Sequence, residues 1–394
     1  MISYIEAQNL SLSQAKSFGT EILSLDEADG RVLAEDVFAD RDYPPFNRSA
    51  MDGYAIRFSD WENGIQEFKV QEVIYAGKIP EKELESGSAF KIMTGSAVPF
   101  PADTVIRRED SNEENQKVSF TIDTLKIFQN IARKGEDLKK GQLTITAATL
   151  CTPSVISTLA TLGKSSIRVE CLPRLALFTT GNEVKHLHEE VLEFEIRNSN
   201  SYLIKSLLKQ WAIFPSAYKH LKDDKEELEI EISKALKYDI IILSGGISAG
   251  DADYVPGVLK DLGVEKLFHK VAIKPGKPIW CGNLPGGPMV FALPGNPFSS
   301  LVTFKLFIEP FLQKSFGLTP SSPTKSFFKG EKGQKTTFDE FFPARIMNAG
   351  TQVEATALNG SGDIRLGIDA DVLAIHPKDA DRLSDGQVID YYPL

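Results

Sequence analysis

A loop rich in glycine and aspartate could bind an anion together with a metal ion. The segment SGGISAGDADY, residues 244–254, follows the apolar run IIIL, and its glycines would let backbone N–H groups converge on a phosphate or another oxyanion. Asp251 and Asp253 would stand beside that anion and repel it unless a cation lay between them. Mg²⁺ held by one or two carboxylates and by phosphate oxygens removes the conflict. Asp253 is therefore a candidate metal ligand.

Two further loops offer another carboxylate and two cations. In TTGNEV, residues 179–184, Glu183 follows a second apolar run and would lie at the same edge of a sheet as the aspartates. In AIKPGKP, residues 272–278, Lys274 and Lys277 flank a Pro-Gly turn, where two lysines suit an oxyanion. The three loops together favour a site for an anionic ligand.

Each loop also has a purely structural interpretation. The glycines of residues 245–250 would only shape a tight turn, and Asp251 or Asp253 would cap the next helix. KPGKP would be a rigid turn with solvated lysines, and Glu183 a surface acid. In ALPGNPFSS, residues 292–300, Ser299 could serve as an ordinary N-cap instead of a ligand.

The elements that must position these loops follow from the pattern of apolar runs. From residue 173 onward strand, loop and helix alternate, which predicts a parallel α/β sheet that binds its ligands at the carboxyl ends of the strands. Residues 52–146 consist of short β-like runs, and the last 65 residues or so suggest a small β-barrel or sandwich. The expected domains are 1–43 with 138–170 (helical and extended linker), 44–137 (β-rich), 171–325 (α/β) and 326–394 (C-terminal β-barrel).

Two local predictions concern the N-terminal segments. SLSQAKSFGTEIL, residues 11–23, has apolar residues at roughly helical spacing and is predicted as part of an N-terminal helix. LTITAATLCTPSVISTLATLG, residues 143–163, is predicted as a strand followed by a helix, with Pro153 in its first turn, where the missing N–H costs little.

Composition excludes several classes of protein. The net charge of −10 opposes nonspecific attraction to nucleic acid or to anionic membranes, and no run of about 18 apolar residues occurs, so we expect neither partner. Cys151, Cys171 and Cys281 are isolated, which argues against a disulfide framework and a zinc site and favours the cytoplasm. The pair His186 and His188 lies in a charged stretch typical of a surface loop.

Eight ordered motifs carry a resemblance to a known family. PPFNRSAMDGYA, IMTGSAVP, RKGED, TTGNE, RNSN, GGISAGDADYV, KPGKP and LPGNPFSS occur in the order found in the molybdopterin molybdenumtransferase family, which includes the bacterial molybdenum-insertion protein and a domain of gephyrin. The chain resembles this family from about residue 5 to its C-terminus. The resemblance implies an enzyme that takes adenylylated molybdopterin and molybdate, inserts the metal at the dithiolene and releases AMP, with Mg²⁺ as the expected ion.

The resemblance also implies an assembly. The family forms an elongated homodimer of four-subdomain chains, with each active site between the α/β domain of one chain and the β-rich domain of the other. The loop of residues 44–57 would then carry Asp52 to the partner's site, with its prolines and Gly53 fixing the path of the chain. Transient contacts with other proteins of molybdenum cofactor synthesis are expected.

Carried over position by position, the resemblance assigns roles to eighteen residues. The catalytic acids and their polar companion are Asp52, Thr94, Asp137, Glu183, Asp223 and Asp253, with Glu183 and Asp253 as metal ligands. The substrate-binding residues are Gly245, Gly246, Ser248, Gly250, Lys274, Lys277, Pro294, Pro297, Ser299, Ser300, Arg345 and Ser361.

Departures from the family pattern leave two alternative functions to consider. Asn47 and Asn198 stand where the family usually has Asp, and the stretch KHLHEEVLEFE replaces a Pro-Gly-rich turn. One alternative is a nucleotide pyrophosphatase related to the competence-damage proteins, against which residues 44–137 argue. The other is a noncatalytic scaffold, against which the intact acids argue.

Overall fold

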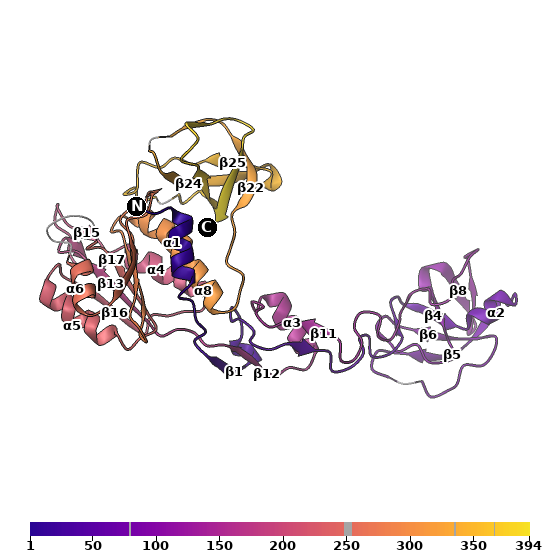
Figure 1. Cartoon of the computed structure of the whole chain (residues 1–394). Coiled ribbons are helices and arrows are strands. Elements are labelled where there is room, and N and C mark those ends of the chain that lie inside the picture. The colour runs from indigo at the N-terminus through magenta and orange to yellow at the C-terminus, as the bar shows by residue number, and fades with distance from the viewer. Residues whose placement is uncertain (79, 248–253, 335, 366) are drawn as a thin grey trace. The chain divides into compact units, whose positions relative to one another are not determined.

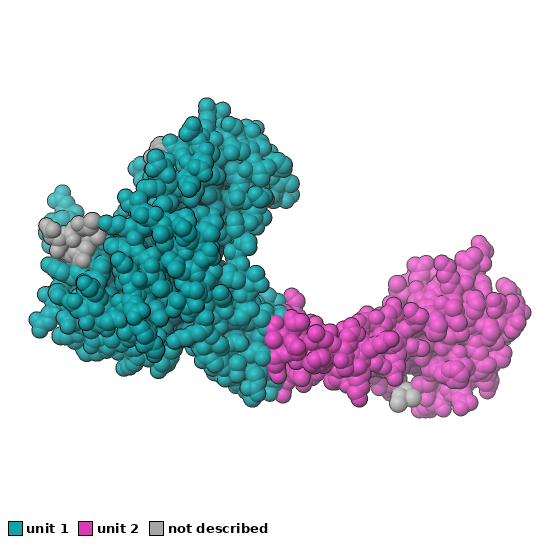
Figure 2. Space-filling view, viewed as in Figure 1, with its two compact units in different colours: residues 1–34, 148–153, 166–394 teal, residues 35–147, 154–165 magenta. Residues whose placement is uncertain are grey.

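The chain folds into two compact units, each built from segments that are distant in the sequence (Figure 2). The computed structural model describes residues 1–78, 80–247, 254–334, 336–365 and 367–394. Unit 1 contains Met1–Ala34, Ala148–Pro153 and Ser166–Leu394, and unit 2 contains Glu35–Ala147 and Ser154–Ser165. Their elements confirm the predicted multidomain α/β plus β fold.

A six-stranded, mainly parallel sheet forms the centre of unit 1 and confirms the predicted α/β architecture. Its order is β16 (Ala217–Leu221), β13 (Leu175–Thr180), β17 (Ile240–Ser244), β21 (Met289–Leu293), β20 (Trp280–Asn283) and β18 (Glu265–His269). The first four strands are parallel, and the last two are antiparallel to their neighbours. From β13 the chain goes to β16 on one side and then to β17 on the other, so the strand order reverses between β13 and β17. Open sheets bind ligands beyond the carboxyl ends of the strands at such a point.

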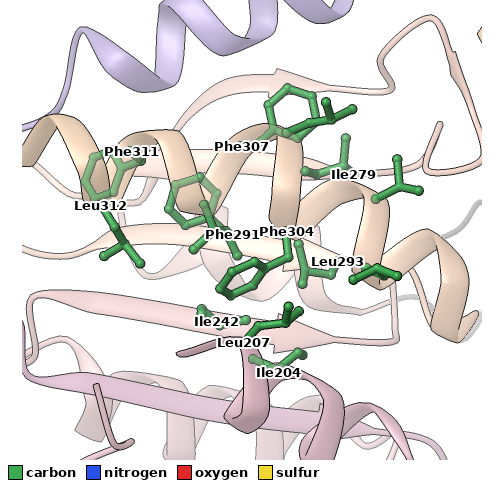
Figure 3. Packing of buried hydrophobic residues seen from close by; sticks show 14 of the residues in the cluster. Ile204, Leu207, Ile242, Ile279, Phe291, Leu293, Phe304, Phe307, Phe311 and Leu312 are labelled. Atoms are coloured by element: carbon green, nitrogen blue, oxygen red, sulfur yellow. The ribbon is translucent and has the colours of Figure 1, made fainter. Parts of the chain in front are cut away.

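Helices cover both faces of this sheet because successive strand residues point to opposite sides. On one face, Ile242, Phe291 and Leu293 pack against α4 (Asn200–Lys209), the π-helical segment Phe304–Ile308 and α8 (Glu309–Ser315), as Figure 3 shows. On the other face, Ile241 and Leu243 pack against α5 (Lys225–Ala235) and α6 (Val255–Asp261). The helix α7 (Pro297–Thr303), the π-helical segment and α8 follow one another without a break. The sheet is therefore buried on both faces, and only its strand ends can receive a ligand.

The N-terminal helix is shorter than the sequence predicted. α1 (Tyr4–Leu12) begins at a capping box of Ser3 and Glu6, and the helical interpretation of residues 13–23 is wrong. Gly19 has a positive φ of 96°, and residues 20–24 form β1 (Thr20–Ser24), which pairs with β12 (Ser166–Glu170). A distant strand thus overrides the local spacing. The other prediction is confirmed, since α3 (Pro153–Thr161) starts at Pro153 and follows β11 (Leu143–Ile145).

A closed five-stranded barrel forms the C-terminal part of unit 1 (Figure 1). Its ring consists of β24 (Asp339–Met347), β25 (Gln352–Ala355), β22 (Thr324–Lys329), β28 (Val388–Pro393) and β26 (Val372–His376), which pairs back to β24. Of the two expected architectures, the barrel is the one observed. β19 (Ile273–Lys274) pairs with β24, so the loop that carries the two lysines is joined to the barrel. β23 (Lys332–Gly333) pairs with β27 (Arg382–Leu383) beside it.

Unit 2 is built around a second six-stranded sheet. Its order is β7 (Thr104–Arg107), β4 (Gly53–Ile56), β6 (Ser88–Ile92), β5 (Glu67–Ile74), β9 (Lys117–Phe120) and β8 (Ser111–Glu114), and α2 (Phe58–Glu62) follows β4. Short pairs of β3 (Arg48–Ser49) with β10 (Ile131–Ala132), and of β2 (Val37–Phe38) with β11, lead into it. A Cβ atom on Gly53 would lie 1.9 Å from the carbonyl oxygen of Ile106, so only glycine fits directly after Asp52. Among the residues described, no helix is both long and apolar enough to cross a membrane.

Candidate active site

The first cavity lies where the strand order reverses, and we call it the carboxylate cavity because Glu183 and Asp223 both line it. Its volume is 740 Å³, and it opens beyond the carboxyl ends of β13 and β17. The residues that line it are 179–181, Glu183, Val184, Val191, 195–200, Asp223, 244–247, 295–297, Gly362 and Ile364. The sheet therefore brings together loops that are more than a hundred residues apart in the sequence.

Neutral amide groups hold the two carboxylate-bearing loops together. The backbone N–H of Asn182 donates to Oδ2 of Asp223 and the backbone N–H of Asp223 donates to Oδ1 of Asn182, both at 3.3 Å. A short parallel pair of β14 (Val184–Lys185) and β15 (Ile196–Arg197) follows directly, and the N–H of Ile196 donates to the Glu183 carbonyl. These bonds fix the backbone on both sides of Glu183, whose side chain is exposed.

The glycine turn after β17 forms another wall of the carboxylate cavity. Gly245 and Gly246 have positive φ angles of 104° and 67°, and a Cβ atom on Gly245 would lie 2.6 Å from Oγ1 of Thr180. The turn thus needs glycine for structural reasons and also borders the cavity, so the two interpretations of this loop are compatible. Ser248, Gly250, Asp251 and Asp253 lie outside the described residues.

The donor set of the carboxylate cavity is compatible with Mg²⁺. No group of three or more His, Cys, Asp and Glu side chains that could hold a metal occurs in the described part of the chain. Glu183 and Asp223 nevertheless line one cavity, and Mg²⁺ is usually held by one or two carboxylates, with phosphate oxygens and water as its other ligands. The residues present therefore fit an open Mg²⁺ site, in which phosphate oxygens and water complete the ligands. They do not fit a site whose ligands all come from the protein. His186 and His188 are exposed, as a surface loop requires.

The second cavity, of 730 Å³, is lined by Lys274, Lys277 and Lys332, and we call it the lysine cavity. It lies between the α/β sheet and the C-terminal barrel. The lining residues are 273–278, 294–296, Ser299, Lys332, Gly333, Thr336, Phe338, 340–343, Ala355, Thr356, Leu358, Gly360 and Ser361. Nζ of Lys277 lies 5.5 Å from the ring centroid of Phe338, and Lys332 pairs with Glu340 at 2.9 Å. Three cations against one carboxylate make the cavity positive.

The LPGNP loop joins the two cavities. Gly295 and Asn296 line both of them, Pro294 lines the lysine cavity, and Pro297 lines the carboxylate cavity. Nδ2 of Asn296 donates to Oγ of Ser361 at 2.8 Å, which ties this loop to the C-terminal barrel. Sequence reasoning missed Asn296, although its position between two candidate prolines could have indicated it.

Three of the remaining candidates differ in their surroundings. Ser299 lines the lysine cavity and is not an N-cap, because α7 begins after Asn296. Ser300 is fully buried and donates to the carbonyl of Pro294 at 2.6 Å, so it supports the loop from behind. Arg345 donates from Nε to the carbonyl of Asp369 at 3.1 Å and is not among the described residues that line either cavity.

Unit 2 holds the other three candidates. Oδ1 of Asp52 accepts hydrogen bonds from both the backbone N–H and the hydroxyl of Thr94, each at 2.7 Å. These bonds lower the pKa of Asp52, the backbone bond most, because both stabilise the carboxylate form. Asp137 is exposed, and its N–H donates to the carbonyl of Tyr43. Oδ1 of Asn47 accepts from the N–H of Lys134, so this hydrogen bond also joins the segment around residues 43–47 to the segment around residues 134–137.

Known proteins match this chain over nearly its full length. A family model of the MoeA N-terminal region (domain I and II) matches residues 2–163, and one of a probable molybdopterin binding domain matches residues 176–314. The molybdopterin molybdenumtransferase of Staphylococcus epidermidis is 32% identical over 99% of this chain and 92% of its own length, and that of Nostoc sp. is 37% identical over 76% and 70%. The crystal structure of a molybdopterin biosynthesis moeA protein from Pyrococcus horikoshii covers both chains completely, with a TM-score of 0.83 and 29% identity.

The α/β domain matches the model of a probable molybdopterin binding domain, and the relatives that match nearly the whole chain are transferases. The identity and coverage of these relatives are high enough to assign the chain to a family. The chain belongs to the molybdopterin molybdenumtransferase family, whose enzymes act in molybdenum cofactor biosynthesis.

Removing the Thr94 hydroxyl should raise the pKa of Asp52. In Thr94→Val one of the two hydrogen bonds to Oδ1 is lost, while the backbone N–H still donates, so the pKa of Asp52 should move toward its usual value but stay below it. A carboxyl ¹³C NMR titration measures this directly. Thr121→Val, on the exposed surface of the same unit, should leave the titration of Asp52 unchanged. An identical pKa in wild type and Thr94→Val would show that the hydroxyl contributes nothing.

Proposed function

We propose that the protein takes adenylylated molybdopterin and molybdate as substrates, transfers molybdenum to the dithiolene sulfurs and releases AMP with the help of Mg²⁺. The observation that carries this proposal is the pair of adjoining cavities with opposite local charge, which share Gly295 and Asn296. The reaction needs a place for a free oxyanion and a place for a pyrophosphate, close enough for one substrate to reach both. Two cavities separated by one loop meet that requirement.

The lysine cavity is the proposed site for molybdate. Molybdate is a tetrahedral dianion, and the ammonium groups of Lys274, Lys277 and Lys332 would concentrate and orient it. The hydroxyls of Ser299 and Ser361 line the same cavity and can donate further hydrogen bonds. The volume of 730 Å³ leaves room for the dithiolene end of molybdopterin beside the oxyanion.

The carboxylate cavity is the proposed site for the pyrophosphate and the metal. The residues that would hold Mg²⁺ are Glu183 and Asp223, with Asp253, outside the described residues, as a further proposed ligand. When bound, Mg²⁺ would act as a Lewis acid and offset the negative charge of the pyrophosphate, an effect worth several kcal/mol. The glycine turn at Gly245 and Gly246 would let the backbone approach the phosphate oxygens closely.

We further propose a homodimer in which unit 2 of one chain completes the site on unit 1 of the other. This follows the family pattern and would bring Asp52, Thr94 and Asp137 to the carboxylates of a partner copy. The hydrogen bonds from Thr94 keep Asp52 charged and oriented for such a role. Transient docking of other proteins of molybdenum cofactor synthesis would deliver the substrate and receive the product.

AMP release tests the proposed function. Purified protein given adenylylated molybdopterin, Mg²⁺ and molybdate should release AMP and yield molybdenum bound to the pterin product, and both should fall to background without molybdate. AMP can be quantified by chromatography and molybdenum by mass spectrometry. Molybdate-independent release would favour a nucleotide pyrophosphatase, and no release would favour a noncatalytic scaffold.

Loss of one lysine should weaken the use of molybdate. Lys274→Ala and Lys277→Ala each remove a charge from the lysine cavity, and the loss of a charged hydrogen bond of about 1.5–3 kcal/mol should raise the KM for molybdate about 10- to 150-fold. Lys325→Ala is the control, because the Lys325 side chain is 74% exposed on β22 and outside the cavity. An unchanged KM in both cavity variants would show that molybdate does not bind in the lysine cavity.

Mixing two inactive variants tests the proposed dimer. Asp52→Ala and Asp253→Ala should each be inactive, but an equal mixture after subunit exchange should recover about one quarter of wild-type activity. About half of the dimers are then mixed, and each has one intact site of two. Mass spectrometry of differently tagged chains verifies the exchange. No recovery despite proven exchange would contradict a site shared between subunits.

A further inference from the structure

We propose that His220 is a positioning residue that holds the Glu183 loop of the carboxylate cavity in place for Mg²⁺. His220 is the fourth residue of β16, at the edge of the sheet, and lies in register with Thr179 of β13. It is not among the described residues that line the cavity, so it would act through its neighbours. The inference rests on the proposed function, in which Glu183 and Asp223 hold the metal.

The chemistry of its neighbours fixes the direction of each hydrogen bond around His220. Nε2 lies 3.0 Å from the carbonyl oxygen of Gly181, which can only accept, so Nε2 carries the hydrogen. Nδ1 lies 3.0 Å from Oγ1 of Thr179. Oδ1 of Asn198 accepts from the N–H of Ser201, so its Nδ2 is the atom that donates to Oγ1 of Thr179 at 2.8 Å. In the neutral imidazole with its hydrogen on Nε2, Nδ1 is an acceptor, so Thr179 donates its own hydrogen to Nδ1.

The result is a series of three hydrogen bonds that run in one direction, and the Asn198 amide donates its second hydrogen to the Tyr218 hydroxyl at 3.2 Å. Asn198 donates to Thr179, Thr179 donates to His220, and His220 donates to Gly181. Asn198 is 3% exposed and Thr179 is 3% exposed, so water competes little for these bonds. The imidazole links the end of β13 to β16 through both of its nitrogens at once.

The last acceptor in this series of hydrogen bonds, the carbonyl of Gly181, belongs to the backbone that leads to Glu183. Gly181 has φ of +138°, and a Cβ atom there would lie 2.8 Å from Cγ2 of Val184, so the backbone at this point is confined to one path. The next residue, Asn182, is bonded to Asp223, which follows His220 by three residues. His220, near the end of β16, and Asp223, just after that strand, thus brace Gly181 and Asn182 of the Glu183 loop, and both proposed metal ligands depend on the same brace.

Two amide substitutions separate the roles of the two ring nitrogens. Glutamine places an N–H donor near the position of Nε2, whereas asparagine places an acceptor near Nδ1 and cannot reach Gly181. Metal affinity is measured by EPR with Mn²⁺ as the probe for the Mg²⁺ site. We expect His220→Asn to weaken Mn²⁺ binding about 10-fold or more, the loss typical for groups that orient metal ligands, and His220→Gln to stay within about threefold of wild type.

Controls distinguish positioning from a general loss of structure. Both variants remove the ring, so urea midpoints that are equal to each other exclude stability as the reason for different metal affinities. His188→Asn, in the exposed loop nearby, should bind Mn²⁺ like wild type. The Mg²⁺ concentration for half-maximal AMP release should rise in His220→Asn in parallel, with the KM for molybdate unchanged.

The outcomes decide the two proposals separately. Equal Mn²⁺ affinity in wild type and His220→Asn, or equal losses in the Asn and Gln variants, would overturn the positioning role. Wild type that binds no Mn²⁺ at this cavity would also overturn it. If wild type binds Mn²⁺ and the two variants differ as expected, but no AMP is released, the proposed reaction fails while the positioning role of His220 stands.

Discussion

The reversal of strand order between β13 and β17 is the constraint on which the site depends. Parallel neighbours must be joined by crossovers, and the crossover to β16 and the return to β17 place α4 and α5 on opposite faces of the sheet. Neither helix can then cover the ends of both central strands. A crevice is left at the carboxyl ends of β13 and β17, and the loops that border it are brought together by topology instead of by sequence.

The second consequence of this architecture is that the carboxylates and the lysines line different cavities. In a single mixed cavity, Glu183 and Asp223 would repel a dianion, and the lysines would compete with a metal ion for the carboxylates. Such a cavity would bind both the dianion and the metal ion weakly. The LPGNP loop keeps the two sets apart while remaining a wall of both. Its position is set from behind by buried Ser300 and from the barrel by Ser361, two contacts far apart in the sequence.

The sequence predicted the sheet and its loops better than it predicted the partners of single residues. The run IIIL and the segment before TTGNE are apolar throughout because both faces of the sheet are buried, so strand and loop could be located. Residues 13–23 were misassigned because the pairing of β1 with β12 is not visible in local spacing. Lys332 could not be found, since it lies on β23, whose pairing with the distant β27 is not visible in local spacing, and neither could the contact of Arg345 with Asp369.

Neutral groups brace Asp52 and the loops that carry Glu183 and Asp223, and this has a physical consequence. Asp52 is held by the N–H and O–H of Thr94, and the loops of Glu183 and Asp223 are held through Asn182. Within the described residues Glu183 takes part in no ion pair, while its neighbour Lys185 is engaged by Glu195 at 3.2 Å. A lysine or arginine bound to these carboxylates would fix them equally well but would offset the charge that a divalent cation needs. Amide and hydroxyl donors fix the position and leave the charge available, so a rigid site and affinity for the proposed metal ion would not oppose each other.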